Sequence, residues 1–366
     1  MHTADLHLGA KIAKLGSKAE EQRIQIQKTF ESLVQLAIDS QVDLFLIAGD
    51  IFDMKNPEKG LIDFFVANLV RLNDRHIFVI VTFGTHDFIE ESSVYKTMDI
   101  FDLPYIKVFN DPAIHSFEIP ELDAIIFSNV ALTNKTSETP LINIKRDERY
   151  RFNIAIAHGS VQIPGKSSQN DSPITFTQIE ETQMDYVALG HWHNQQELSK
   201  GKVICWYAGP PEMVNLDEKN SGKILMVYIE DAHAVEVESI TVGKRFSDEL
   251  ILDVSSMNTF EELLQEMRVN ANPDLVRKVI LKGIVSSDFG NISTDEIEMR
   301  IGQEFFYLSI KDKTESAVID IEREIEGNLL KSKFIVKINE MGLEESVKND
   351  ALQMGLSLLR GSKKIT

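Results

Sequence analysis

The chain has only one cysteine, Cys205, among its 366 residues. No disulfide can form within these residues, so a reducing compartment such as the cytoplasm is the predicted location. No apolar run is long enough to cross a bilayer as a helix. The N-terminus also lacks the basic and apolar segments of a secretory signal. Together these absences favour a globular cytoplasmic protein without a membrane partner.

Basic residues are scarce as well, with 38 Lys and Arg against 57 Asp and Glu and a net charge of −19. Tight non-specific binding of nucleic acid normally uses a basic surface, so this charge argues against it. A nuclease is not excluded, because metal ions supply local positive charge where a phosphate must lie. A partner protein could supply the remaining contacts. The alternative is that the charge serves solubility alone.

The first 240 residues alternate short apolar runs with amphipathic stretches, which predicts an α/β domain over residues 1–242. Two helices are predicted, Ala19–Ile38 and Leu61–Leu72. The second is apolar nearly all round, which favours burial inside the fold; burial against a second copy of the chain is the alternative. The segments predicted as buried strands are Val42–Ala48, Ile77–Phe83, Ala124–Asn129, Ile154–Ala157, Asp185–Leu189, Val203–Ala208 and Ile224–Ile229.

Near residue 243 the pattern changes, which predicts a small α+β domain over residues 243–335. Its predicted elements are a helix Thr259–Val269 capped by Asn258 or Thr259, a strand Leu275–Lys282, a helix with Thr294 as a candidate cap, and a strand Phe305–Ile310. Residues 336–366 form a third segment, in which Glu344–Arg360 is predicted to be helical. Such a terminal helix more often packs on its own domain than on a partner.

Five polar clusters each follow an apolar run, and five of the nine histidines fall in them. Carboxylates and imidazoles that converge at strand ends suit divalent ions of the manganese, iron or zinc type. Two such ions close together suit phosphoester hydrolysis. A single histidine after a strand is often only a hydrogen-bond donor, so the weight lies in the joint pattern. The clusters are Asp5-Leu6-His7, Gly49-Asp50-Ile51-Phe52-Asp53, Gly84-Thr85-His86-Asp87, His158-Gly159 and Gly190-His191-Trp192-His193.

The spacing within the clusters suggests roles. Asp5 and His7 stand two apart, as do His191 and His193, so each pair can point at one ion. Asp50 has two carboxylate oxygens and can bridge two ions, and His158 is a further imidazole ligand. Asp53 and Asp87 are weaker candidates. Each could hold a ligand imidazole or a loop amide, or could cap a helix.

His86 is the candidate for acid–base catalysis, because it lies beside the proposed ligands without needing to bind metal. Cleavage of a phosphodiester requires a proton for the leaving oxygen, and imidazole is matched to neutral pH. The nucleophile would be a water activated by the ions. The loop Ser160–Ser172 directly follows His158 and is expected either to border this site or to be a solvated connector.

These clusters resemble the five motifs of the calcineurin-like metallophosphoesterases, and within them the SbcD-type DNA repair exonucleases. The opening His2–Gly9, the Gly49–Asp53 and Leu189–His193 segments and Tyr207–Glu212 carry the closer likeness, which covers about residues 1–240. The resemblance implies a β-sandwich flanked by helices, with a dinuclear site, a small capping domain and a C-terminal helix. It also implies a nuclease that processes DNA ends in double-strand-break repair.

The same resemblance implies roles for individual residues and partners. Asp5, His7 and His193 would hold one ion, Asp50 would bridge, and His158 and His191 would hold the other. His86 would be the catalytic acid or orienting group. The implied metal is manganese, two ions per site. The implied partners are double- and single-stranded DNA, a second copy of the chain bound through nuclease-domain helices, and a coiled-coil ATPase of the SbcC type docked partly through the C-terminal region.

Two departures from the family pattern stand out. Thr85 occupies the place of an asparagine whose amide oxygen ligates the second ion, so this metal is expected to bind more loosely unless Thr85 coordinates adequately. Only three residues follow Met1 before Asp5, so the first strand is expected to be short and the natural start could lie upstream. Two further hypotheses remain: a phosphoesterase acting on a small phosphodiester or phosphoprotein, and a weakly catalytic scaffold for the ATPase.

Overall fold

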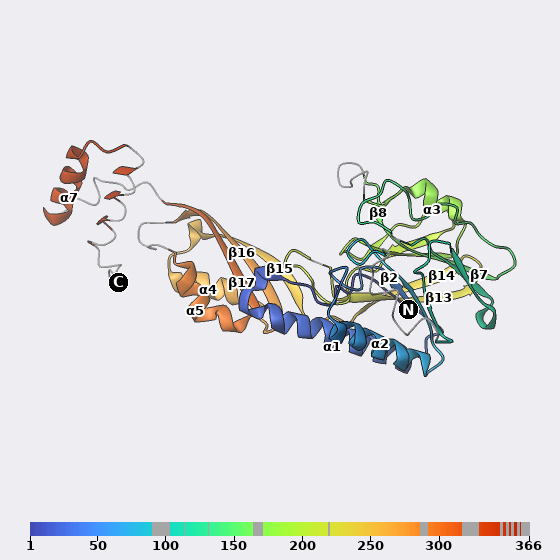
Figure 1. Cartoon of the computed structure of the whole chain (residues 1–366). Coiled ribbons are helices and arrows are strands. Elements are labelled where there is room, and N and C mark those ends of the chain that lie inside the picture. The colour runs from blue at the N-terminus through green and yellow to red at the C-terminus, as the bar shows by residue number, and fades with distance from the viewer. Residues whose placement is uncertain are drawn as a thin grey trace. The chain divides into compact units, whose positions relative to one another are not determined.

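The computed structural model describes all residues except 90–102, 114, 131, 164–170, 219, 286–291, 317–328, 345–346, 349–350, 353–354, 357–358 and 360–366. The chain divides into two compact units, Met1–Ser247 and Asp248–Thr366 (Figure 1). Within the described residues, no helix has the length and apolar character needed to span a bilayer.

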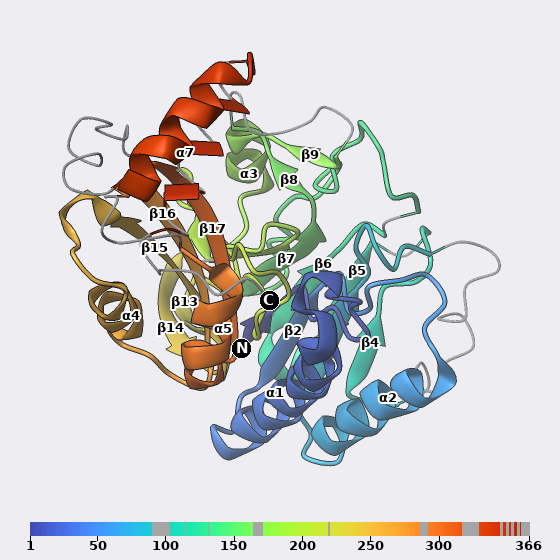
Figure 2. The ribbon, with the colours of Figure 1, turned by 90° about the vertical axis from the view of Figure 1, so that its left-hand side faces the viewer.

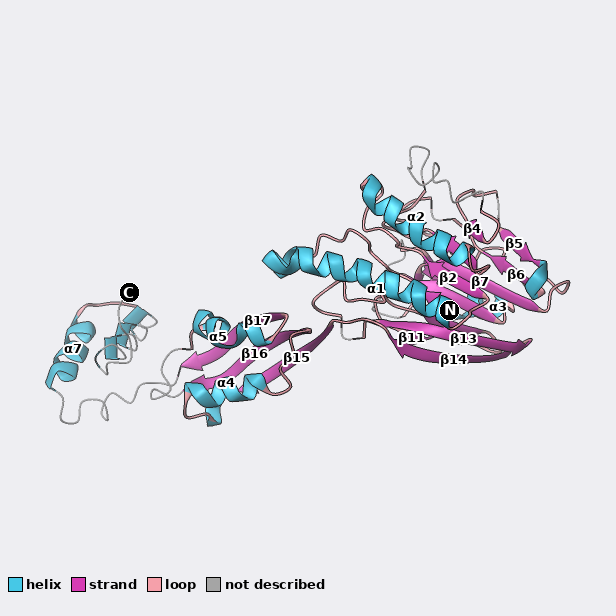
Figure 3. Ribbon diagram, turned by 90° about the horizontal axis from the view of Figure 1, so that it is seen from below, coloured by secondary structure: helices cyan, strands magenta, loops and turns pink. Residues whose placement is uncertain are grey.

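The first unit contains two six-stranded sheets, drawn in magenta in Figure 3. One has the order β14-β13-β1-β2-β3-β4, and the other has the order β11-β12-β10-β7-β6-β5. The strands of the first sheet are β1 (His2–Thr3), β2 (Leu44–Ala48), β3 (Phe78–Thr82), β4 (Ile106–Val108), β13 (Lys223–Asp231) and β14 (Ala234–Thr241). Those of the second are β5 (Ser116–Ile119), β6 (Ala124–Phe127), β7 (Phe152–His158), β10 (Tyr186–Gly190), β11 (Gln196–Glu197) and β12 (Ile204–Tyr207).

Three hydrophobic clusters show that the layers are helix, sheet, sheet and helix. Between the sheets, Leu46 and Ile80 pack against Ile126 and Ile156. On the outer face of the first sheet lie α1 (Ala19–Asp39) and α2 (Lys59–Asn73), whose apolar faces meet β2, β3 and β4 (Figure 2). On the outer face of the second lies α3 (Phe176–Thr182), which begins with a capping box of Thr175 and Gln178.

The strand directions decide where the polar clusters lie. β1, β2, β3 and β4 are parallel, and so are β6, β7, β10 and β12. The carboxyl ends of parallel strands open onto one edge of a sheet, where ligands bind in open α/β folds. Here Gly190 at the end of β10 pairs with His158 at the end of β7, so segments distant in sequence are brought side by side.

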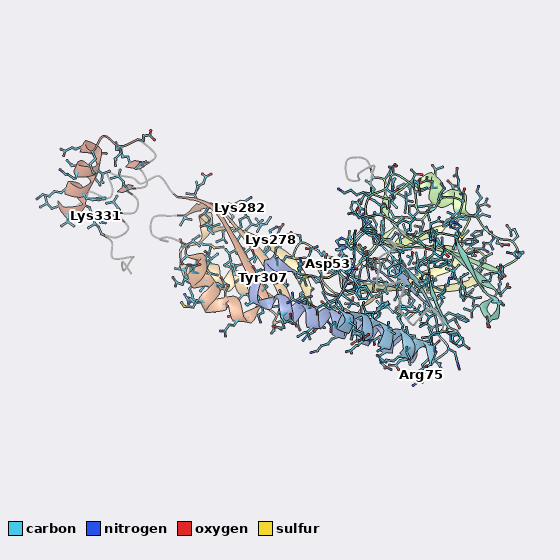
Figure 4. The ribbon with its side chains drawn as sticks, in the orientation of Figure 1. Asp53, Arg75, Lys278, Lys282, Tyr307 and Lys331 are labelled. Carbon is cyan, nitrogen blue, oxygen red and sulfur yellow. The ribbon has the colours of Figure 1, made fainter. Side chains whose placement is uncertain are left out.

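The second unit contains a three-stranded sheet, β15-β16-β17, and two helices that share one core with it. β16 and β17 are parallel. Arg277 on β16 pairs with Asp248 at 2.6 Å and donates to the carbonyls of Met267 and Val269 at the C-terminal end of α4. The bounds are β15 (Phe246–Asp253), β16 (Leu275–Val285), β17 (Tyr307–Ser316), α4 (Phe260–Arg268) and α5 (Thr294–Ile301). Figure 4 labels Lys278, Lys282 and Tyr307 on these strands.

The C-terminal part contains α7 (Leu329–Glu340), which the sequence did not predict and which spans residue 335, the predicted end of the small domain. The described residues between 347 and 359 are helical, whereas Glu344 is not. The rest of the predicted helix Glu344–Arg360, including Met354, lies outside the described residues. Ile335 of α7 packs with Leu352 and Leu356. This contact agrees with a terminal helix that packs on its own unit.

Two local predictions were wrong. The cap of α5 is Ser293, whose hydroxyl accepts from the Glu296 amide, so Thr294 is instead the first helical residue. The segment Ser160–Ser172 is not loop throughout, because Ser160–Val161 (β8) pairs with Pro173–Ile174 (β9); residues 164–170 lie outside the described part. The short helices are η1 (Ala13–Lys18), η4 (Pro120–Leu122), η5 (Val254–Ser256) and η6 (Gly302–Glu304).

Candidate metal centre

The polar clusters meet at the carboxyl ends of β1, β2, β3, β7 and β10. Four of the predicted ligands there have left-handed or otherwise positive backbone angles, with φ of 54° at Asp5, 44° at His7, 47° at Asp50 and 116° at His191. Such conformations cost about 1–3 kcal/mol each for residues other than glycine and persist only where the surroundings enforce them. Backbone bonds from Asp5 N to Gly49 O (3.1 Å) and from His7 N to Asp50 O (3.0 Å) provide that constraint.

One group of donors consists of Asp5, His7 and His193, whose ligand atoms all lie within 4.8 Å of one another. The two histidines face each other, with 2.9 Å between their Nε2 atoms. Their Nδ1 atoms lie against carboxylates, Asp53 at 2.9 Å from His7 and Glu218 at 2.5 Å from His193. A carboxylate can only accept, so we assign both Nδ1 atoms as donors, which leaves two Nε2 lone pairs directed at the same point.

A second group consists of Asp5, Asp50 and His158. His158 Nδ1 lies 3.0 Å from the carbonyl oxygen of Ala48 and must donate to it, so Nε2 carries the lone pair. That Nε2 lies 3.2 Å from Asp50 Oδ2, which is itself 3.9 Å from His7 Nε2. Asp50 Oδ2 therefore lies between the two groups, as a bridging carboxylate requires.

His191 repeats the same arrangement. Its Nε2 lies 2.9 Å from Asp171 Oδ2, and its Nδ1 lies 3.3 Å from His158 Nε2. With Nε2 donating to Asp171, Nδ1 has a lone pair that faces the lone pair of His158. In their neutral, metal-binding form all four histidines would thus direct a lone pair inward.

Thr85 is half-buried on the loop after β3. The amides on either side of it hold this loop, since Gly84 N donates to Asp87 Oδ1 at 2.7 Å and His86 N donates to Asp50 Oδ1 at 2.8 Å. A Cβ on Gly84 would lie 2.2 Å from Asp50 Oδ1, so only glycine allows the loop to approach the carboxylate this closely.

His86 differs from the other histidines because its side chain is 49% exposed. Its ring stands edge-on to His7 with 5.0 Å between centroids, and its Nδ1 lies 3.5 Å from Asp53 Oδ1. With His7 and Asp53 it forms a third group of side chains that could hold an ion. The imidazole also lies beside the two groups described above and is open to solvent. This is the placement that proton transfer to an incoming substrate needs.

Asp53, labelled in Figure 4, and Asp87 contact different kinds of group. Asp53 contacts the imidazoles of His7 and His86, as described above. Asp87 is buried and accepts from three backbone amides, those of Ile51 (2.7 Å), Phe52 (3.1 Å) and Gly84 (2.7 Å). Asp87 thereby joins the loops after β2 and β3, while Asp53 fixes ring orientation.

The buried carboxylates shift the pKa values of their neighbours. Burial alone would lower the pKa of His158, but the Asp50 carboxylate raises it to about 10. Burial would also lower the pKa of His193, but the hydrogen bond to Glu218 outweighs burial and the pKa rises to about 9. Burial raises the pKa of Asp5, and burial with the nearby Asp50 charge raises that of Asp87 to about 7. The site therefore favours added positive charge.

The donor set fits divalent ions. Two buried carboxylates and four imidazoles with inward lone pairs match the oxygen and nitrogen ligands of manganese, iron or zinc. Asp5, His7, Asp50 and His158 are each at most 4% exposed, which gives such ions a largely dry environment. Among the described residues, the candidate donor groups all lie in the Met1–Ser247 unit.

Three site residues were not predicted from the sequence: Asp171, Tyr207 and Glu218. The hydroxyl of Tyr207 donates to Gly159 O and accepts from Val161 N, both at 2.7 Å, and so fixes the chain after His158. Tyr207 lies in a segment that carried the family resemblance, which was a usable signal. Asp171 and Glu218 follow no apolar run, so the pattern that identified the other residues could not identify these two.

The fold and these donors define a phosphoesterase of the two-sheet type. The model of the calcineurin-like phosphoesterase family matches residues 1–195, more than half of the chain, and the chain belongs to this family. The predicted family, the fold class with its β-sandwich flanked by helices, and the metal-dependent hydrolase class are thereby confirmed.

Two of the three relatives described here are DNA double-strand break repair proteins named Mre11. The DNA double-strand break repair protein Mre11 of Thermoplasma acidophilum is 25% identical over 256 residues, 67% of this chain and 62% of that protein. Mre11 of Sulfurisphaera tokodaii is 24% identical over 302 residues, 77% of this chain and 73% of its own. An uncharacterized metallophosphoesterase of Bacillus subtilis, YhaO, is 25% identical over 298 residues, 76% and 71% of the two chains.

Proposed function

We propose that this protein is a dinuclear-metal phosphodiesterase that cleaves DNA and processes DNA ends in double-strand-break repair. The observation that carries the proposal is that two donor groups lie on either side of Asp50 Oδ2. Their three histidines, together with His191, each turn a ring nitrogen inward. Two divalent ions bound there would supply the charge that a phosphate requires and an acidified water as nucleophile. Manganese is the proposed ion.

The chain's own residues orient the reaction. Asp5, His7 and His193 would hold one ion; His158, His191 and Thr85 would hold the other, with Asp50 shared. His86 keeps Nδ1 toward Asp53, which leaves Nε2 to donate a proton to the leaving oxygen of the scissile phosphodiester. The half-buried Asp53 also fixes His7, so one carboxylate orients both rings.

DNA is the favoured substrate because two relatives of 24–25% identity are named as double-strand break repair proteins. The net charge of −19 repels the phosphates of a nucleic-acid duplex, so a partner with a basic surface would help to bind the DNA. We propose that a coiled-coil ATPase of the SbcC type provides that surface, that residues 336–366 contribute to its docking, and that the nuclease forms a cytoplasmic homodimer. Residues 243–335 would act as the capping domain.

The test is cleavage of end-labelled linear duplex and single-stranded DNA with manganese, with magnesium or with a chelator. Manganese-dependent shortening is expected, and His86→Ala should reduce it by about 10²–10⁴-fold, the usual contribution of a positioned acid. His115→Ala is the matched control, because His115 is an exposed histidine bound to Asn129 and outside the donor groups.

Two outcomes would change the assignment. Hydrolysis of a simple aryl phosphodiester without DNA cleavage would favour the small-substrate or phosphoprotein hypothesis. Loss of both activities in protein that binds only one ion would favour the scaffold hypothesis, in which Thr85 has weakened the second site.

A further inference from the structure

Glu218 contacts the imidazole of His193, one of the candidate metal ligands. Its Oε1 lies 2.5 Å from Nδ1 of His193, and the side chain is only 7% exposed. The other oxygen, Oε2, accepts from the amide of Val214 at 2.8 Å. Both oxygens are therefore engaged, and the carboxylate is fixed relative to the imidazole. Glu218 lies beyond the residues 1–195 that the family model matches.

The same residue is bonded to the segment that leads into the second unit. The hydroxyl of Ser247 donates to the backbone carbonyl of Glu218 at 2.5 Å, and Ser247 is the last residue of the first unit. Glu212 strengthens this connection, because its carboxylate accepts from the amides of Lys244 (2.9 Å) and Arg245 (3.0 Å). Residues 212–218 thus bind residues 244–247 at three points.

Arg245 anchors the other side of this connection. Its Nη1 donates to Oε1 of Gln22 at 2.8 Å, and its Nη2 pairs with Glu21 at 2.7 Å. Gln22 in turn donates to Met213 O at 2.7 Å. Because α1 holds both Met213 and Arg245, the segment that contains Glu218 and the strand entering the second unit share one support.

We propose that Glu218 is a positioning residue for the metal centre, which keeps His193 in the tautomer with Nε2 unprotonated, and that Ser247 couples this positioning to the entry of the second unit. The inference rests on the metal site of the proposed function. It predicts that the ion held by Asp5, His7 and His193 depends on Glu218, whereas the ion near His158 does not.

The experiment is calorimetric titration of the metal-stripped full chain with manganese. Glu218→Ala should weaken one of two binding events by about 10–100-fold, the usual effect of removing a group that holds a ligand imidazole. The second event should keep its affinity. Glu218→Gln retains an acceptor oxygen and should recover part of the loss. Asp217→Ala is the matched control, since this neighbouring carboxylate is 60% exposed and pairs with Lys14.

Two further readouts separate positioning from general damage. Nitrogen NMR of the histidine rings in the zinc-loaded chain should show His193 with Nδ1 protonated and Nε2 as the ligand atom in the wild type. Glu218→Ala should show a mixture of the two ring forms. Ser247→Ala should weaken the same binding event by up to about fivefold, because one hydrogen bond to a neutral group is lost.

The outcomes distinguish the two proposals. Wild-type binding of two ions with unchanged binding in both Glu218 variants overturns the role of Glu218 and leaves the metal site intact. A wild-type chain that binds no manganese overturns both. If Glu218→Ala does not fold, Glu218→Gln is the deciding variant. If Glu218→Gln binds manganese with wild-type affinity although its His193 ring shows a mixture of forms, the inference is also overturned.

Discussion

In the proposed metal centre, individual side chains would decide how strongly each ion is held, and Thr85 is the most informative of them. An asparagine amide is a longer and stronger neutral donor than a hydroxyl. Thr85→Asn is therefore expected to tighten the weaker manganese site by roughly fivefold, the equivalent of about 1 kcal/mol. The measurement is manganese titration together with the rate of DNA cleavage. Thr133→Asn, at an exposed loop position, is the control. Unchanged affinity and rate would show that Thr85 already coordinates adequately.

His2 should make the stability of the protein depend on pH. Burial lowers the pKa of His2 to about 3, whereas an unfolded histidine titrates near 6.5. As the pH falls below about 6.5, the unfolded chain takes up a proton that the folded chain does not, so stability is lost. The expected loss between about pH 7.5 and about pH 5.5 is about 1.4 kcal/mol.

His2→Asn provides the comparison for this effect. Asparagine keeps a polar atom near the Tyr186 hydroxyl, which lies 2.8 Å from His2 Nδ1, but it does not titrate. Urea unfolding at the two pH values should show a smaller acid-induced loss in the variant. An equal loss in both proteins would mean that other groups account for the acid sensitivity.

At this same scale the sequence predicted the residues that converge, but not the atoms that fix them. Asp5, His7, Asp50, His158, His191 and His193 were recognisable because each follows an apolar run. Their carboxylate partners Asp171 and Glu218 come from loops, and which imidazole a loop residue meets depends on the tertiary fold alone. The contact between Glu218 and His193 spans 25 residues and has no periodic signature.

At the scale of whole elements, the metal centre depends on loops that approach each other closely at the ends of the strands. Gly84→Ala would place a Cβ 2.6 Å from Asp50 N and 2.2 Å from Asp50 Oδ1. The loop after β3 must then move away, and the bond from His86 N to Asp50 is expected to break. We expect a loss of about 1–3 kcal/mol in folding stability and weaker binding of both ions. Thermal unfolding and manganese titration would measure the two effects.

Gly60→Ala is the matched substitution for this prediction. Gly60 lies in α2 and no atom lies within 4 Å of its added Cβ. Alanine is the better helix former, so this variant should be neutral or more stable by up to about 1 kcal/mol. Similar losses in the two alanine variants would argue against a steric cause at Gly84.

The sequence predicted elements well where their apolar pattern is long. Long helices and central strands were located within a few residues, for example α1 and β3. β4 has three residues and β14 is a largely exposed hairpin partner of β13, so neither carries a strong apolar run. The error at Thr294 has a simple origin, because two adjacent hydroxyl residues both suit a cap and only the backbone angle selects Ser293.

For the molecule as a whole, metal binding should stabilise one unit and leave the other unchanged. The candidate donors all belong to Met1–Ser247 within the described chain. Manganese at about 100 times its dissociation constant should add about 2.7 kcal/mol to the stability of that unit. Hydrogen exchange should slow there and stay constant in residues 248–366, and a chelator should reverse the change. Equal protection of both units would show that they unfold together.

Along the whole chain the residue pattern predicted an α/β part, a smaller α+β part and a C-terminal segment, and these domain bounds stay predictions. The same pattern could not predict α7, because Leu329–Glu340 mixes apolar and charged residues without a clear face. Ile335 of this helix packs against Leu352 and Leu356, a tertiary contact that the local sequence does not predict.

Cys205 is the single cysteine of the chain, and its burial has a practical consequence for labelling experiments. This thiol is fully buried in β12, and burial raises its pKa well above the ordinary value. Maleimide reagents require an accessible thiolate, so the native surface offers them no natural target. One cysteine introduced in each unit would therefore accept spin labels or fluorophores without background. Distances between such probes, recorded with and without manganese, would test whether the separation of the two units depends on the ion.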